Sequence, residues 1–279
     1  MTDLDCDTDQ HSDGGRVRRS ALRREPGRSA SGRSMVHART GPTLNATGLA
    51  KSFGAVPALT AVDLIARPGR VTGFIGPNGA GKSTSLRILT GLVRADHGTA
   101  TVDGVPYAEL PCPPRVLGVV GDLAGAHPAM TAAGHLHTQA AMIGVPPARV
   151  HQVLEESGLR SAADRRVRGF STGMRQRLAL ATALLPDPAG LLLDEPTNGL
   201  DPSGIVWLRG VLRAFADAGG TVLVSSHVLT ELQQVIDDLT LIENGRTLWS
   251  GTLSDFTSAH NSLEEAYLTM IEREASCSN

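Results

Sequence analysis

The pattern of apolar and polar positions changes near residue 43. Residues 1–42 are rich in Ser, Gly, Asp and Arg and show almost no apolar periodicity. Because such a segment buries too little apolar surface to offset the entropy lost on ordering, we expect a disordered tail there. Its basic part, from Arg16 to Arg39, has the charge to contact anionic lipid or nucleic acid, although a solvated tail is the simpler interpretation. Met35 is an alternative translation start to Met1.

From about Thr43 onward, short apolar runs separated by Gly and Pro predict alternating strands and helices. Strands are indicated by TLNATGLAKSF, TAVDLIA and RVTGFIG, and a helix by Leu86, Leu89 and Val93, which recur with helical spacing after Lys82. Residues from about 125 to 186 have a mostly helical pattern, and strand-like runs return as GLLLDE, TVLVSSH and LTLIENG. Strands buried on both faces that alternate with helices predict an α/β fold with a mainly parallel sheet.

The C-terminal segment, residues 251–279, contains the pattern of an amphipathic helix. Ser262 and Glu265 have the spacing of a capping box at its start. One face would carry the apolar side chains Leu263, Ala266, Tyr267, Met270 and Ile271. We expect this face to dock on the body of the same chain rather than on a partner.

Composition and charge narrow the classes of protein. The formal net charge of -2 gives no global reason to expect nucleic acid, and an aromatic content of 3% argues against a surface that stacks bases. No apolar run approaches the roughly 18 residues of a membrane span, and the N-terminus lacks the apolar core of a secretory signal. Cys6, Cys112 and Cys277 are too few and too scattered for a disulfide framework or a metal cluster. The chain reads as cytosolic.

The run GPNGAGKST, residues 76–84, fits the phosphate-loop pattern G-x-x-x-x-G-K-[ST] between a predicted strand and a predicted helix. Glycines let the backbone direct N–H groups at phosphate oxygens, and the helix N-terminus adds donors of its own. Lys82, one of two lysines in a chain that otherwise uses arginine, would place a compact charge on the β- and γ-phosphates. Ser83 would hold Mg²⁺. The residues expected to bind ATP here are Gly76, Pro77, Asn78, Gly79, Ala80, Gly81, Lys82, Ser83 and Thr84.

A second motif, LLLDEP, places Asp194 and Glu195 at the end of a buried strand. In an α/β sheet the carboxyl ends of strands face the crevice where ligands bind. Asp194 would then coordinate Mg²⁺ through water, and Glu195 would orient and deprotonate the attacking water. Acidic residues after leucines are weak evidence alone, because many strands end in charge, but together with the phosphate loop they are specific.

Two further stretches carry a resemblance to a known family. FSTGMRQRLALATALL, residues 170–185, ends shortly before Asp194, and TVLVSSH ends at His227. With the NGLDP run that follows Glu195, these residues resemble the ATP-binding-cassette (ABC) ATPases over about residues 43–250. The resemblance implies a P-loop NTPase core, an antiparallel β subdomain, and a helical signature subdomain over about residues 125–186.

The resemblance also implies roles for single residues. Ser171 and Gly173 would bind the γ-phosphate of an ATP held by a second ATPase subunit in a head-to-tail dimer, although Ser171 also fits a mere helix cap. His227 would contact the γ-phosphate as a catalytic residue, and Phe53 would stack on adenine. Asp122 stands where the family has a glutamine that senses Mg²⁺, so its role as a metal ligand and the coupling it supports are in question.

The sequence therefore predicts a cytoplasmic, ATP-hydrolysing subunit that drives a separate integral-membrane permease and lies at the inner face of the membrane. FSTGMRQRL and GLDPSGI resemble ATPase subunits of bacterial drug and antibiotic exporters, which favours export. The alternative is a non-transport ABC ATPase acting on nucleic acid or ribosomes. The basic tail is the one feature of the sequence that favours it. A third possibility is a catalytically weak, ATP-gated structural partner. No residue identifies the cargo.

Overall fold

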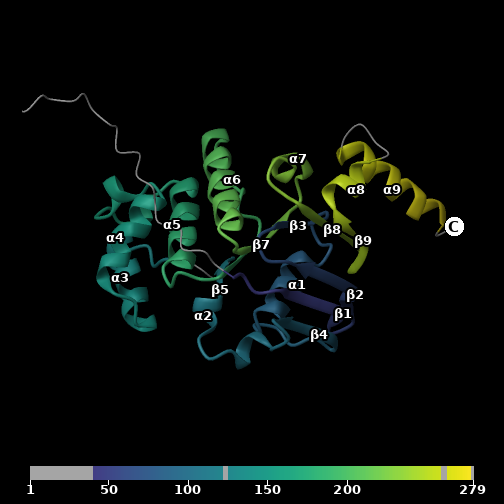
Figure 1. Ribbon diagram of the computed structural model, residues 1–279, viewed down its shortest axis with the longest axis horizontal. Helices are drawn as coiled ribbons and strands as arrows, with labels where there is room; N and C mark the ends of the chain where they lie inside the picture. The colour runs from purple at the N-terminus through teal and green to yellow at the C-terminus, as the bar shows by residue number, and fades with distance from the viewer. Residues whose placement is uncertain (1–39, 122–124, 259–262, 278–279) are drawn as a thin grey trace, which may run out of the picture. The chain divides into compact units, whose positions relative to one another are not determined.

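The core of the fold is a nine-stranded sheet, seen in a computed structural model that describes residues 40–121, 125–258 and 263–277. The strand order is β4-β1-β2-β9-β8-β3-β7-β6-β5 (Figure 1). The strands are β1 Leu44–Phe53, β2 Val56–Ala66, β3 Val71–Ile75, β4 His97–Val102, β5 Leu117–Val120, β6 Gly190–Leu193, β7 Thr221–Ser226, β8 Asp238–Glu243 and β9 Arg246–Thr252. The predicted tail, residues 1–42, lies almost wholly outside the described residues.

Helices connect and cover these strands. The α-helices are α1 Lys82–Leu89, α2 Pro113–Val116, α3 Ala132–Ile143, α4 Pro147–Glu156, α5 Thr172–Leu184, α6 Pro202–Asp217, α7 Leu229–Leu232, α8 Leu253–Thr257 and α9 Leu263–Cys277. Three short 3₁₀ turns are η1 Tyr107–Glu109, η2 Arg160–Ala162 and η3 Val167–Gly169. Between β5 and β6 the described chain is helical, with α3, α4 and α5 packed on one another through buried apolar residues. None of the helices traced in the described part of the chain combines the length and apolar character needed to cross a membrane.

The sheet has a parallel part and an antiparallel part, as the sequence predicts. β5, β6, β7, β3 and β8 pair in parallel, whereas β1 pairs antiparallel with β2 and β4, and β9 pairs antiparallel with β8. Every residue of β3, β6 and β7 is buried, which explains their near-continuous apolar sequences. Because these three strands are parallel neighbours, their carboxyl ends bring residues 76, 194 and 227 to one edge of the sheet.

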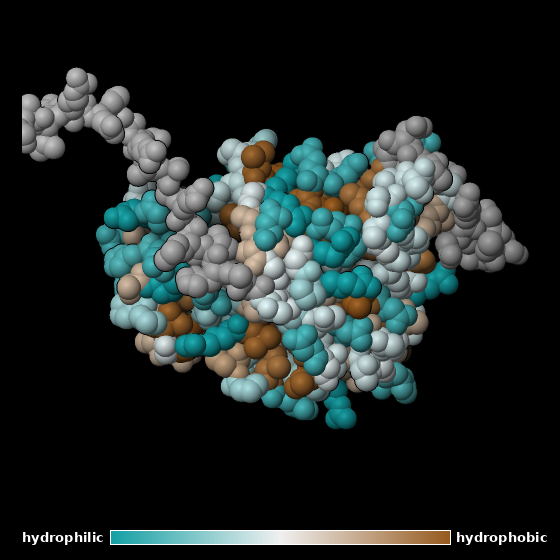
Figure 2. Space-filling model, viewed as in Figure 1, coloured by the Kyte–Doolittle hydropathy of each residue, from teal (hydrophilic) through white to brown (hydrophobic). Residues whose placement is uncertain are grey.

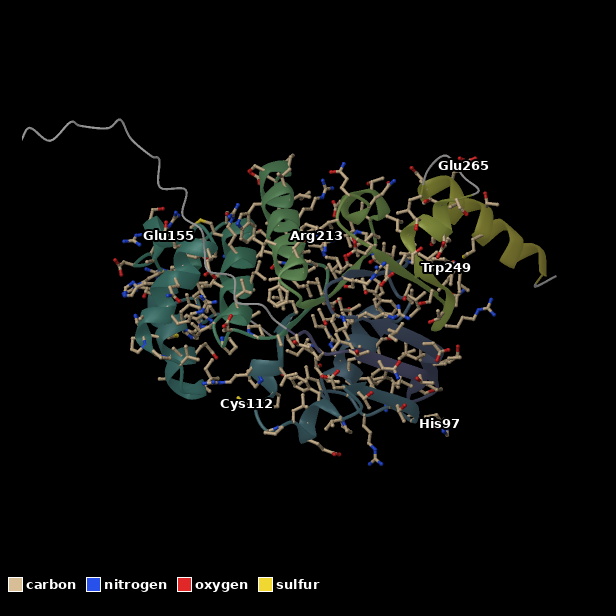
Figure 3. The ribbon with its side chains drawn as sticks, viewed as in Figure 1. His97, Cys112, Glu155, Arg213, Trp249 and Glu265 are labelled. Atoms are coloured by element: carbon tan, nitrogen blue, oxygen red, sulfur yellow. The ribbon has the colours of Figure 1, made fainter. Side chains whose placement is uncertain are left out.

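Ion pairs lie at the other end of these strands, where β3 and β8 begin. Arg70 donates through Nε and Nη2 to the buried carboxylate of Asp238, over 2.6 and 2.7 Å. Those hydrogen bonds raise the pKa of Arg70 above its ordinary value. Arg213 of α6, which Figure 3 labels, donates to both oxygens of Asp237. The buried carboxylate of Asp238 is therefore paired, which a charge removed from water requires.

The C-terminal segment contains more structure than the one predicted helix. β9 runs to Thr252, and α8, only five residues long, precedes α9. Leu263 and Ala266 of α9 are buried in the main core cluster, and Tyr267 and Met270 pack against it. These four residues of the predicted apolar face thus dock on the body of the chain, as expected, whereas the side chain of Ile271 lies outside the described part of the structure. Ser262, the first residue of the predicted capping box, lies outside the described residues. On the face shown in Figure 2, hydrophilic residues surround scattered apolar ones.

Candidate active site

The phosphate loop joins β3 to α1 and is built where only glycine fits. A Cβ on Gly76 would lie 2.1 Å from the carbonyl oxygen of Ile242, and one on Gly81 would lie 2.4 Å from Leu59 Cδ2. Gly81 also has φ of 105°, a conformation that residues with a Cβ avoid. No side chain caps α1 at Gly81, so the first N–H groups of the helix are available to an anion.

Lys82 lies beneath this loop and is 5% exposed. Its Nζ donates to the carbonyl oxygens of Gly76 over 2.7 Å and Pro77 over 3.1 Å. The same Nζ is 3.2 Å from Oε1 of Glu195, close enough for an ion pair but without hydrogen-bond geometry. A lysine suits this place because its compact ammonium carries three donors that can be directed separately, whereas an arginine has a planar fork.

Asp194 and Glu195 follow β6, as the sequence predicts, and a serine of β7 holds both of them. The backbone N–H of Asp194 donates to the carbonyl oxygen of Val120 over 2.8 Å, and its Oδ1 accepts from Ser225 Oγ over 2.6 Å. The backbone N–H of Glu195 donates to the same Ser225 Oγ over 2.9 Å. Glu195 has φ of 48°, so the chain turns sharply away from the sheet at this residue.

The carboxylate of Glu195 lies between Lys82 and His227. Oε2 is 2.8 Å from Nδ1 of His227 and also accepts from the backbone N–H of His227 over 3.3 Å. Oε1 is buried and has no hydrogen-bond partner among the described residues. A buried carboxylate oxygen costs free energy unless a donor reaches it. This oxygen is therefore suited to accept a proton or a hydrogen bond from a bound water or ligand.

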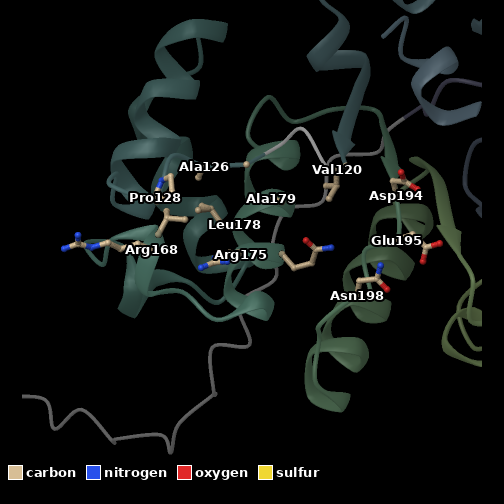
Figure 4. Close-up of a pocket in the computed structure, with 14 residues that line it drawn as sticks. Val120, Ala126, Pro128, Arg168, Arg175, Leu178, Ala179, Asp194, Glu195 and Asn198 are labelled. Carbon is tan, nitrogen blue, oxygen red and sulfur yellow. The ribbon is translucent and has the colours of Figure 1, made fainter. Parts of the chain in front are cut away.

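A cavity of about 460 Å³ opens beside these residues, between the helical region and the end of β6. Figure 4 shows Asp194, Glu195 and Asn198 on one side of it and the side chains around α5 on the other. Arg168, Arg175 and Gln176 add polar groups to its lining. The sequence assigned no role to Arg168 or Arg175 as single residues, because their place beside Glu195 depends on how the helical region packs against the sheet.

Ser171 and Gly173 are placed apart from this cavity, whose lining does not include them. Ser171 Oγ accepts from the backbone N–H of Met174 over 3.2 Å and so caps α5. A Cβ on Gly173 would make only ordinary contacts, the nearest being Leu200 Cδ2 at 3.5 Å. Among the described residues, none lies close enough to require glycine at 173.

Phe53 ends β1 with its ring 53% exposed, so it is not a core residue. Lys51 Nζ lies 5.6 Å from the centroid of the ring and 2.8 Å from Oδ1 of Asp96. Asp96 also accepts from the backbone N–H of Ser52, and the hydrogen bond from Lys51 is the larger cause of its lowered pKa. An exposed aromatic ring is available for stacking on a base.

The predicted metal ligands remain. Ser83 and Asp194 offer a hydroxyl and a carboxylate, oxygen donors of the kind that Mg²⁺ prefers. Asp122, the third predicted ligand, lies outside the described residues. Within the described part of the chain, no group of three or more His, Cys, Asp or Glu side chains could hold a metal ion by itself.

Ser225, which contacts both acidic residues, was not singled out from the sequence. The signal was present, since TVLVSSH places this serine in a buried strand, after the apolar residues Val222–Val224 and directly before Ser226 and His227. A buried hydroxyl in a central strand requires a partner. Which partner it has could only follow from the strand order, which places β7 beside β6.

Comparison with known proteins agrees with this geometry. The family model described as "ABC transporter" matches residues 59–198. The lantibiotic transport ATP-binding protein SrtF of Streptococcus pyogenes is 36% identical over 205 residues, or 74% of this chain and 89% of SrtF. The daunorubicin/doxorubicin resistance ATP-binding protein DrrA of Streptomyces peucetius is 36% identical over 79% of this chain and 69% of DrrA. A solved ATP-binding subunit of an ABC transporter superposes with a TM-score of 0.74 at 26% identity, covering 82% of this chain and 99% of that one.

The fold, the phosphate loop and the acidic strand end define an ATPase of the ATP-binding-cassette class. The chain belongs to the ABC transporter family and is an ATP-binding subunit, which confirms the resemblance drawn from residues 43–250. Since the family hydrolyses ATP to power transport, the chain is an enzyme.

Proposed function

We propose that this chain hydrolyses ATP to drive a separate integral-membrane permease that exports a drug-like or antibiotic molecule. The observation that carries the catalytic part is the Glu195 carboxylate, which lies between Lys82 and His227 at the end of β6. The printed names of SrtF and DrrA, lantibiotic transport and daunorubicin/doxorubicin resistance, support the class of cargo. With such a permease, the subunit would work at the cytoplasmic face of the membrane.

The residues of this chain divide the hydrolytic step among them. The loop glycines and the first turn of α1 bind the phosphates, and we expect Lys82 Nζ to turn from the carbonyl oxygens it contacts toward the β- and γ-phosphates. A water oxygen attacks the γ-phosphorus, the bond to the ADP oxygen breaks, and Glu195 takes a proton from the water. The products are ADP and inorganic phosphate.

Other residues support the reaction. His227 holds Oε2 through its ring and its backbone N–H, which leaves Oε1 to receive the proton. Ser83 and Asp194 would hold Mg²⁺, which supplies positive charge to the phosphate oxygens when it is bound. Ser171 and Gly173 would bind the γ-phosphate held by a second ATPase subunit, so that two chains enclose two nucleotides head to tail.

The experiment that tests the proposal uses the Glu195→Gln protein. Size-exclusion chromatography with and without Mg–ATP should show a shift from monomer to dimer only with ATP, because ATP that is bound but not cleaved holds the two subunits together. The same protein, purified from detergent-treated membranes of its host, should bring a permease chain with it. Recovery of RNA or ribosomes in place of a membrane chain would contradict the transport role.

A further inference from the structure

Ser225 occupies the point at which the ladder between β6 and β7 ends. Leu193, the last residue of β6, is in register with Val224, so Ser225 comes one step later, beside the start of the Asp194–Glu195 turn. Its side chain is completely buried. A hydroxyl that is buried in this way is unfavourable unless it is hydrogen-bonded.

The Ser225 hydroxyl makes two hydrogen bonds, and both go to the catalytic turn. Oγ donates its hydrogen to Oδ1 of Asp194 over 2.6 Å and accepts from the backbone N–H of Glu195 over 2.9 Å. A hydroxyl has one donor and two acceptor lone pairs, so it can make both bonds at once. One atom thus connects the two acidic residues that the sequence places at the end of β6.

The backbone of Glu195 explains why such a contact is needed. Its φ of 48° is a left-handed conformation, which is unfavourable for a residue with a Cβ and persists where surrounding contacts hold it. The turn directs the Glu195 side chain toward Lys82 and His227, and the Ser225 hydroxyl takes the N–H that the departing strand can no longer pair.

We propose that Ser225 is a positioning residue for ATP hydrolysis, which holds the Asp194 carboxylate and the Glu195 backbone in one arrangement. The inference rests on the proposed function of Glu195 as the base. Ser225 has its two bonds inside the protein and acts on the reaction through its neighbours. Without the hydroxyl, Asp194 Oδ1 and the Glu195 N–H lose their partner, while Lys82 and the phosphate loop keep their contacts. Chemistry should therefore slow far more than nucleotide binding weakens.

The test is the steady-state ATPase activity of Ser225→Ala, together with its dissociation constant for ADP. We expect kcat to fall about 10- to 100-fold, the range typical when an outer partner of a functional residue is lost. KM for ATP and the ADP dissociation constant should stay within about threefold of wild type. Ser225→Thr, which restores the hydroxyl, should recover most of kcat.

The matched control is Thr72→Val in β3, the strand on the other side of β7. Thr72 is completely buried like Ser225, but its Oγ1 has no hydrogen-bond partner among the described residues. Removing this hydroxyl should leave kcat unchanged. An equal loss of kcat in both variants would overturn the proposal. It would show that kcat falls whenever a buried hydroxyl of this sheet is removed, whether or not that hydroxyl contacts the acidic turn.

Other outcomes also decide the matter. Wild-type kcat in a folded Ser225→Ala protein would overturn the proposal, and so would loss of ADP binding in parallel with kcat. If Ser225→Ala does not fold, Ser225→Cys provides a side chain of similar size with a weak donor, and wild-type kcat in that variant would overturn it equally. The proposed function fails separately, if Glu195→Gln hydrolyses ATP at the wild-type rate.

Discussion

The N-termini of α1 and α5 both have the sequence of an anion-binding site, yet the structure completes them differently. At α1, Gly81 provides no side-chain cap, Lys82 is the first residue of the helix, and Glu195 and His227 reach the same place from other parts of the chain. At α5, Ser171 caps its own helix, and a Cβ at Gly173 would meet nothing closer than 3.5 Å. Within the described residues, the groups gathered at α1 all come from this chain, and we expect the α5 site to function only with an ATP held by a second subunit.

The largest expected effect is at the base of the α1 site. Glu195→Gln keeps the shape of the side chain but removes its ability to take a proton, so kcat should fall about 10² to 10⁴-fold with ATP binding retained. Phosphate release and nucleotide binding, measured separately, check this expectation. Glu243→Gln is the matched control, because Glu243 also ends a strand of the sheet. Equal activity in the two variants would show that Glu195 is only a charged strand end.

Nucleotide affinity should be the next largest effect. Lys82→Ala removes the buried ammonium that we expect to reach the phosphates, and loss of charge-assisted hydrogen bonds of about 1.5–3 kcal/mol weakens binding roughly 10- to 150-fold. Fluorescence titration with a labelled ATP analogue measures this. Lys82→Arg retains the charge and tests whether shape matters. Wild-type affinity in Lys82→Arg would mean that the compact ammonium is not required beneath the loop.

The sequence could predict the parts of this site that are contiguous motifs, but not the contacts between distant segments. The phosphate loop and the Asp194–Glu195 pair are contiguous motifs, and a short run of residues determines their local geometry. The contact of Glu195 with Lys82 and His227, and that of Ser225 with Asp194, join residues that lie in or shortly after three different strands, β3, β6 and β7. Such contacts depend on β7 lying between β3 and β6, an order that local patterns do not encode.

The fold shows a similar division. The buried strands β3, β6 and β7 coincide with apolar runs, so the parallel core could be predicted. β2 starts at Val56, earlier than its apolar run suggests, because pairing with β1 across a hairpin rather than burial makes this part a strand. In the same way, α8 spans five residues and is too short for helical periodicity to be detected.

A cap substitution tests the α5 side of the comparison. Ser171→Ala and Thr131→Ala each remove a hydroxyl that caps a helix, of α5 and α3 respectively, and each should cost about 1 kcal/mol of unfolding free energy. If Ser171 also meets the ATP of a second subunit, its variant alone should lose ATPase activity, by about tenfold for one lost hydrogen bond of about 1.4 kcal/mol. Equal ATPase activity in the two variants would show that Ser171 only caps its helix and does not contact ATP.

The smallest expected effect is on the binding of adenine. It tests whether the side chain that stacks on adenine comes from the same chain as the phosphate-binding loop. Phe53 presents an exposed ring beside Lys51, and stacking of an aromatic pair contributes about 0.5–1.5 kcal/mol. Phe53→Ala should therefore weaken ATP binding about 2- to 12-fold and leave inorganic triphosphate binding unchanged, because triphosphate has no base. Val56→Ala, at a residue 67% exposed across the hairpin, is the control for loss of apolar surface. Should both variants bind ATP like wild type, adenine must be held by another part of the assembly, and the α1 site would be less self-contained than its phosphate contacts indicate.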